Sequence, residues 1–288
     1  MDYLTGSLPV EPRKTGVSSG RMERGRYVGY AFLLCAALLV GVAAQAAGTF
    51  AAKNEFFVYV GTYTRQQSKG IYAYRFQPAT GNLTSIGLVG ETENPSFLGI
   101  HPNRRFLYAV NEISKFEGQP AGSVSAFSID AKTGILTFLN KVSTRGGGPC
   151  HLVVDKTGKC LLVANYGSGS VAAFPVKEDG SLGEATAFVQ HSGSSVGPRQ
   201  KGPHAHMVLL SSDNRFVFVP DLGLDQVFAY RPDPAKATIA PNDPPFAKLA
   251  QGSGPRHMAF HPNGQFAYVN SEMGSIMTAF AYAPPAGA

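Results

Sequence analysis

The chain has 288 residues, of which 44% are hydrophobic and 15% charged, with a formal net charge of +6. This composition is typical of a globular protein, and the length allows a substantial core. Residues 1–46 hold five of the 25 basic and three of the 19 acidic side chains, which leaves 20 and 16, a net +4, for the remainder. Because no run of Lys and Arg alternates with aromatic residues, we expect no nucleic-acid partner.

The N-terminal 52 residues predict export. Three arginines precede an uncharged stretch, residues 27–52, whose apolar core Ala31–Ala44 is followed by a small-x-small sequence, Ala44-Gln45-Ala46. These are the parts of a cleaved secretory signal peptide, which predicts a periplasmic or secreted protein. The alternative is an uncleaved membrane anchor formed by residues 27–52, which are long enough to span a bilayer. Met22 is an alternative start, which would make residues 1–21 a leader.

The remainder of the chain, residues 53–288, contains a motif that recurs at one spacing. The four copies read Asn94-Pro95-Ser96-Phe97, Gly148-Pro149-Cys150-His151, Gly202-Pro203-His204-Ala205-His206 and Gly254-Pro255-Arg256-His257. Their last residues lie at positions 97, 151, 206 and 257, which gives steps of 54, 55 and 51 residues. A repeat with a period near 50 residues indicates a solenoid or a propeller.

Each repeat contains four short apolar runs bounded by Gly, Asp and Asn. In the second copy of the motif the runs are His151–Asp155, Cys160–Asn165, Ser170–Val176 and Ser181–Val189. Runs of this kind predict strands, and no window after the N-terminus has helical periodicity. Four strands per repeat are the content of one β-propeller blade, so we predict an all-β propeller of four-stranded antiparallel blades. The absence of Trp argues against a WD40 propeller.

The predicted ring is incomplete at both ends. The first repeat begins with Phe56–Tyr63, which corresponds to a second strand, and the last repeat stops at Tyr282 after its third strand. Residues 53–288 therefore predict about five blades. We expect either that the chain is part of a longer ring or that partners cover the exposed strand edges.

The repeated histidines are candidate site residues, because the innermost strand of each blade lines the central channel. His151, His206 and His257 should meet at one mouth of the channel, with His204 and Arg256 beside them. Histidine suits a general base titrating near pH 6–7, and arginine suits an anionic substrate. The alternatives are histidines that only satisfy turns and an Arg256 that bridges two blades.

We expect no metal and no cofactor. A three-histidine metal site is disfavoured, because adjacent blades should separate equivalent residues too widely. Cys150 and Cys160 lie out of register in their predicted hairpin, which argues against an intrachain disulfide and favours buried free thiols. The alternative is a nucleophilic Cys150.

Two segments, Arg199–His206 and Gly252–His257, resemble the lactonase family of seven-bladed propellers, which includes propeller-type 6-phosphogluconolactonase and carboxy-muconate lactonising enzyme. Tyr59–Thr64, Tyr108–Glu112 and Ala164–Gly167 support the resemblance, which covers residues 56–282. It implies seven blades, of which about five are present. The resemblance implies that catalysis uses His151 with an acid after a second strand, either Asp221 or Glu272, with Glu112 as a more remote third. The resemblance also implies that Arg199 and Arg256 bind substrate, and their places at the mouth of the channel add His204, His206 and His257 to the candidate substrate-binding residues. Asp221 has an alternative role, to bind turn amides.

The expected function is hydrolysis of a sugar or related lactone, with water activated by the histidine and the acid and an anionic substrate held by arginine. An exported enzyme is expected to act on a lactone other than the cytosolic 6-phosphogluconolactone. The rival is an exported propeller without catalytic activity that serves as a binding or surface module.

Overall fold

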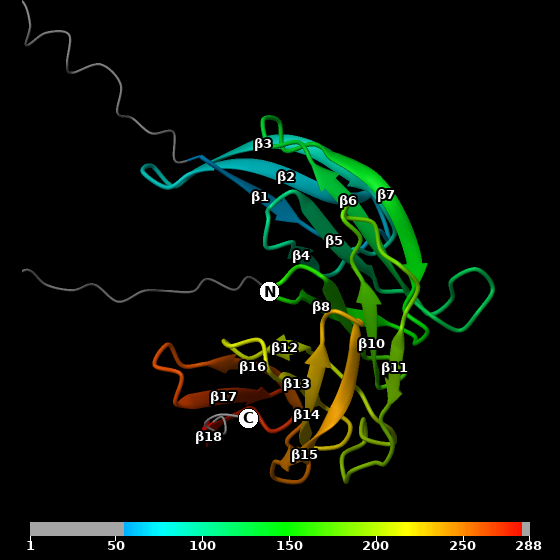
Figure 1. Ribbon diagram of the computed structural model, residues 1–288, viewed down its shortest axis with the longest axis vertical. Helices are drawn as coiled ribbons and strands as arrows, with labels where there is room; N and C mark the ends of the chain where they lie inside the picture. The colour runs from blue at the N-terminus through cyan, green and yellow to red at the C-terminus, as the bar shows by residue number, and fades with distance from the viewer. Residues whose placement is uncertain (1–54, 284–288) are drawn as a thin grey trace, which may run out of the picture. The chain divides into compact units, whose positions relative to one another are not determined.

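The structure is a computed structural model that describes residues 55–283, and this part of the chain forms eighteen strands and no helix (Figure 1). The described residues belong to one compact unit, Asn54–Ala288. They include no helix of the length and apolar character needed to cross a membrane. The predicted signal peptide or anchor lies outside the described residues.

The strands form five antiparallel sheets in chain order, which confirms the predicted propeller blades. The first sheet comprises β1 (Phe56–Val60), β2 (Gly70–Gln77) and β3 (Asn82–Glu91). The second and third comprise β4 (Leu98–Ile100), β5 (Phe106–Asn111), β6 (Ser123–Ile129), β7 (Leu136–Ser143), β8 (Pro149–Val154), β9 (Cys160–Asn165), β10 (Ser170–Pro175) and β11 (Ala187–Gln190). The fourth and fifth comprise β12 (Leu209–Leu210), β13 (Val217–Asp221), β14 (Gln226–Asp233), β15 (Thr238–Lys248), β16 (Pro255–Phe260), β17 (Phe266–Ser271) and β18 (Ile276–Ala281).

Two of the four innermost strands begin within the repeated motif, as predicted, whereas β4 and β12 begin after it, at Leu98 and Leu209. β8 and β16 start at Pro149 and Pro255, whereas β12 is only two residues long. In the fourth blade Ala205 makes an isolated bridge to Asp221 instead of joining a strand. The outer strand of the third blade is also shorter than the predicted run Ser181–Val189, because Pro175 at the end of β10 has no N–H with which to pair.

A turn glycine joins neighbouring blades in a repeated contact. Gly134 and Gly180 have φ values of +77° and +84°, which only glycine adopts without strain. The hydroxyl of Tyr59 donates to the Gly134 carbonyl, and that of Tyr108 donates to the Gly180 carbonyl, both at 3.0 Å. The same tyrosine–glycine bond therefore links the first blade to the second and the second to the third.

Each pair of adjacent blades encloses its own apolar cluster. Tyr108, Leu152 and Phe174 are buried between the second and third blades, and Val219 and Tyr230 belong to the cluster between the third and fourth. Separate clusters join the first blade to the second and the fourth to the fifth. This packing fixes the positions of the innermost strands, and through them the positions of the motif residues.

Candidate active site

The structure brings the three repeated histidines together, as the spacing predicts. The ring of His257 lies 5.7 Å from that of His151 and 5.3 Å from that of His206, measured between centroids. Phe97, the residue that replaces histidine in the first copy of the motif, packs against His151 with the ring centroids 3.9 Å apart and the ring planes tilted by 32°. All four aligned positions therefore meet at or just before the starts of the innermost strands.

The clustered histidines are neutral because the site is buried. Burial, with the neighbouring His257 and His206, lowers the pKa of His151 to about 3. Burial and the charge of Arg256 lower the pKa of His206 to about 4, and the same two causes lower that of His257. The expectation of a group titrating near pH 6–7 is therefore wrong for His151, whose side chain is almost fully enclosed.

These shifts predict how stability depends on pH. Below pH 6.5 the unfolded chain protonates His151 but the folded chain does not, so stability falls as the pH drops from about 6.5 to about 3. Replacing His151 with Phe, the residue already used at position 97, should reduce the loss in free energy of unfolding between pH 7.5 and pH 4 by up to a few kcal/mol. Urea unfolding of both proteins at pH 4 and pH 7.5 measures the effect. An equal loss of stability in both proteins would show that the buried imidazole of His151 does not cause the pH dependence.

Two arginines meet a single carboxylate beside the histidines. Glu272, which follows β17, accepts hydrogen bonds from Nη1 of Arg199 and, at 3.0 Å, from Nε of Arg256. Although burial opposes ionisation, the bond and charge of Arg199, helped by the charge of Arg256, hold the pKa of Glu272 below its ordinary value. The arginine side chains remain 51% and 36% exposed. Arg256 thus pairs within its own blade, whereas Arg199 links the loop before the fourth blade to the fifth.

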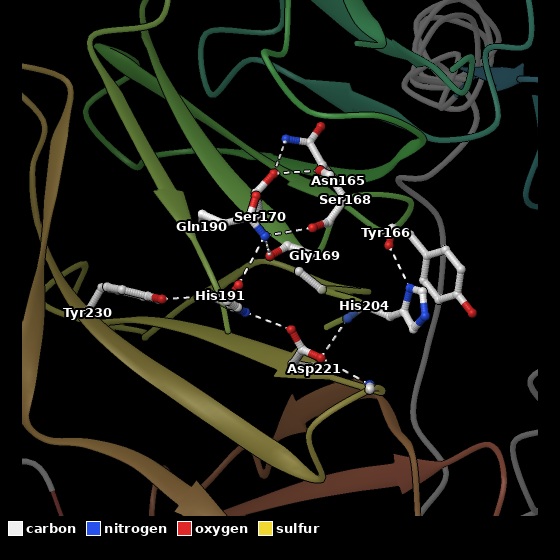
Figure 2. Close-up of polar contacts among 12 residues, drawn as sticks. Asn165, Tyr166, Ser168, Gly169, Ser170, Gln190, His191, His204, Asp221 and Tyr230 are labelled. Carbon is white, nitrogen blue, oxygen red and sulfur yellow. Dashed lines mark hydrogen bonds and ion pairs between the residues drawn. The ribbon is translucent and has the colours of Figure 1, made fainter. Parts of the chain in front are cut away.

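Tyr166 is a site residue that the sequence analysis missed. Its hydroxyl accepts a hydrogen bond from Nη2 of Arg199 at 2.8 Å, and its ring stacks on His204 at 4.6 Å. A bond of 2.9 Å joins Nδ1 of His204 to the carbonyl of Tyr166 (Figure 2). Tyr166 follows β9 as Glu272 follows β17, and this shared repeat position could have identified it. Glu112, at the same position after β5, accepts a bond from Tyr63 at 2.7 Å.

Asp221 has the surroundings of a carboxylate that binds turn amides, the alternative recognised in the sequence. It is fully buried and accepts hydrogen bonds from the backbone N–H groups of His204 at 2.7 Å and Gly223 at 3.0 Å. Its other oxygen lies 2.6 Å from Nδ1 of His191 (Figure 2). Nε2 of that histidine lies 2.7 Å from the hydroxyl of Tyr230. His191 is therefore a core residue.

Both described cysteines are free thiols, as predicted. Burial raises the pKa of Cys150 to about 12, and its Sγ lies 3.2 Å from the carbonyl of His206, which are poor conditions for a nucleophile. The histidine rings lie closer together than the sequence argument against a metal assumed. Among the described residues no three His, Cys, Asp or Glu side chains are grouped as metal ligands.

The fold and this site define a β-propeller with a mixed histidine and arginine site where its innermost strands begin. Residues 57–288 match the family described as lactonase, 7-bladed beta-propeller, and the chain belongs to that family. It is 37% identical over 234 residues to the 6-phosphogluconolactonase of Bacillus subtilis, covering 81% of this chain and 64% of the relative. The 6-phosphogluconolactonase of Formosa agariphila is 32% identical, with 78% and 64% covered.

A solved structure has the same fold. The periplasmic gluconolactonase of Pseudomonas aeruginosa superposes with a TM-score of 0.74 at 37% identity, with 80% of this chain and 65% of that chain covered. The chain thus spans just under two thirds of the length of these relatives.

Proposed function

We propose that this protein acts as an exported lactone hydrolase, which opens an anionic sugar lactone or a related lactone. The observation that carries the proposal is the meeting of three neutral histidines with the Arg199–Glu272–Arg256 group at the starts of the innermost strands. The similarity to 6-phosphogluconolactonases and to a periplasmic gluconolactonase supports both the chemistry and the export.

In the proposed reaction the arginines bind the anionic group of the substrate. Nε of Arg256 is bonded to Glu272, and its two Nη atoms have no partner among the described residues, so the planar fork is available to a phosphate or carboxylate. A neutral imidazole of His151 or His257 takes a proton from water as the water attacks the lactone carbonyl. The positive groups stabilise the oxyanion. As the bond between the carbonyl carbon and the ring oxygen breaks, the imidazolium returns its proton to that oxygen, which becomes the hydroxyl of the product acid.

Proton release from sugar lactones tests the proposed activity. The 288-residue chain is assayed beside a chimera in which the Bacillus subtilis relative supplies the part of its length that this chain does not match. Calorimetry measures the affinity of both proteins for 6-phosphogluconate and gluconate. Absence of both hydrolysis and binding in the two proteins would favour a binding module for another ligand.

Arg256 is expected to contribute to affinity more than to stability. Replacing Arg256 with Leu should weaken binding of 6-phosphogluconate about 100-fold, which is about 2.7 kcal/mol, because a charge-assisted pair is lost. Arg105, an exposed arginine in the turn between β4 and β5, supplies the control Arg105→Leu, which should leave affinity unchanged. Unchanged affinity of the Arg256 variant with a large drop in melting temperature would instead assign Arg256 a structural role.

A further inference from the structure

A further buried carboxylate contacts the loops that carry the charged residues of the candidate active site. Asp225, in the turn between β13 and β14, is only 3% exposed. Its Oδ1 accepts hydrogen bonds from Nε2 of Gln200 and the N–H of Gly254, both at 2.8 Å, and from Oγ of Ser253 at 3.2 Å. Its Oδ2 accepts from Oγ of Ser195 at 2.5 Å and from the N–H of Gly252 at 2.7 Å. Five donors therefore surround one side chain.

These donors come from the two loops that carry the arginines. Ser195 and Gln200 belong to the loop that contains Arg199. That loop is closed by a 2.9 Å bond from the Ser195 N–H to the Gln200 carbonyl and by a 2.8 Å bond from the Gly197 N–H to Oε1 of Gln200. The side chain of Gln200 is fully buried and has little freedom to move. The carboxylate of Asp225 is thus connected to Arg199 through Gln200, the next residue in the chain.

The other loop, Gly252–Gly254, leads directly into Arg256. The same loop also holds the turn that carries Glu272, because the Glu272 N–H donates to the Gly254 carbonyl at 2.8 Å. The Met273 and Gly274 N–H groups donate to the Ser253 carbonyl at 3.1 and 2.8 Å. Asp225 therefore contacts the supports of all three charged groups while lying apart from each of them.

The repeat itself does not require an acidic residue at this position. The equivalent residues in the neighbouring blades are Gly169 and Ser275, and all three positions have left-handed φ values, +64°, +54° and +51° in chain order. Such a φ favours glycine, although Asp tolerates it better than most residues. The loops that Asp225 binds explain why the fourth blade has a carboxylate there.

We infer that Asp225 is a positioning residue that fixes the separation of Arg199 and Arg256, and thereby the preference of the site for a phosphorylated ligand. The inference rests on the proposed function for its ligand. Asp225 is ionised in this role: burial opposes ionisation, but the bonds from Ser195, Gly254, Gly252 and Gln200 hold its pKa below its ordinary value. An amide at this position would turn its NH₂ group toward donors, so Asn cannot replace all five bonds.

The chain provides a matched control in Asp155, a fully buried carboxylate at the opposite end of β8 from His151. It also accepts five hydrogen bonds, from the N–H and hydroxyl of Thr157, the N–H groups of Lys159 and Cys160, and Nδ2 of Asn214. Its donors carry no part of the candidate site. Asp155→Asn therefore reproduces the loss of a buried, saturated carboxylate without affecting the arginine loops.

The test compares Asp225→Asn and Asp155→Asn in the 288-residue chain. Hydrogen exchange should show faster exchange of the amides of residues 195–200 and 252–254 together in Asp225→Asn only. The ratio of affinities for 6-phosphogluconate and gluconate should fall at least 10-fold in Asp225→Asn and stay unchanged in Asp155→Asn, whereas both variants should melt at lower temperature. Ser195→Ala, which removes a single bond, should move the ratio in the same direction if Asp225→Asn fails to fold.

The outcomes separate this inference from the proposed function. An unchanged ratio despite faster exchange in both loops overturns the positioning role, and faster exchange in only one loop overturns the link between them. Lack of binding of either ligand by the unsubstituted chain counts against the proposed function. In that case the hydrogen-exchange data alone test whether Asp225 links the two loops.

Discussion

Replacing His151 with Phe is expected to lower lactone hydrolysis at least about 100-fold, the range seen when a general base is removed. Phe97 shows that the architecture accepts a phenyl ring at this repeat position, and its ring already packs against that of His151. The substitution therefore removes the nitrogen atoms while leaving a ring of similar size, so the loss reports chemistry more than packing.

This loss is measured as initial rates of proton release. The measurement uses the 288-residue chain or the chimera, whichever hydrolyses the lactones. Because burial holds the pKa of His151 near 3, the rate of the unsubstituted enzyme should not fall between pH 7.5 and pH 5 through protonation of this group. His101 is the matched control: it lies in a turn, with Nε2 2.9 Å from the carbonyl of Gly158. His101→Phe should retain hydrolysis. Equal losses in the two variants would exclude a specific role for His151.

The repeat spacing was sufficient to predict the blades and the meeting of the motif residues. Steps of 54, 55 and 51 residues place Phe97, His151, His206 and His257 at one position of successive blades, and the packing of adjacent blades then brings them together. The prediction succeeded because a propeller relates equivalent positions by rotation about one axis. A single sequence therefore contains enough information whenever its repeats are recognisable.

The contacts that depend on residues outside the motif could not be predicted. The bond between Asp221 and His191 joins positions 30 residues apart in different blades. His191 lies in a Ser- and Gly-rich stretch whose composition indicates an exposed loop, yet its ring is buried and stacks on Phe228 at 3.9 Å. The low pKa of His151 likewise depends on burial in three dimensions, which motif spacing does not report.

The repeat does explain Asp221 once the structure is known. The equivalent residues at the ends of β5 and β9 are Asn111 and Asn165, both fully buried. Nδ2 of Asn111 donates to Oγ1 of Thr92 at 2.7 Å, and Nδ2 of Asn165 donates to the carbonyl of Thr144 at 3.2 Å. Thr92, Thr144 and His191 each follow the outer strand of the preceding blade. We therefore propose that Asp221 and His191 form the fourth blade's version of an inter-blade polar pair.

This role predicts a large effect on stability. Asp221→Ala should lower the free energy of unfolding by about 3–5 kcal/mol, because it leaves the amides of His204 and Gly223 and the ring of His191 without their acceptor in a buried place. Urea unfolding measured by circular dichroism gives the value. A loss below about 1 kcal/mol would contradict the proposed pairing, since surface carboxylates have effects of that size.

A double variant distinguishes this structural role from catalysis by Asp221. The double variant Asp221→Asn with His191→Thr gives the fourth blade an Asn–Thr pair. The same pair, Asn111 with Thr92, occupies the equivalent position of the second blade. The double variant should be more stable than Asp221→Ala, although the space left beside Phe228 and Tyr230 keeps it below the unsubstituted chain. Because the amide oxygen of Asn can still accept from the His204 N–H, hydrolysis should stay within a few-fold of the unsubstituted enzyme. A folded double variant without hydrolysis would show that the carboxylate itself takes part in the reaction.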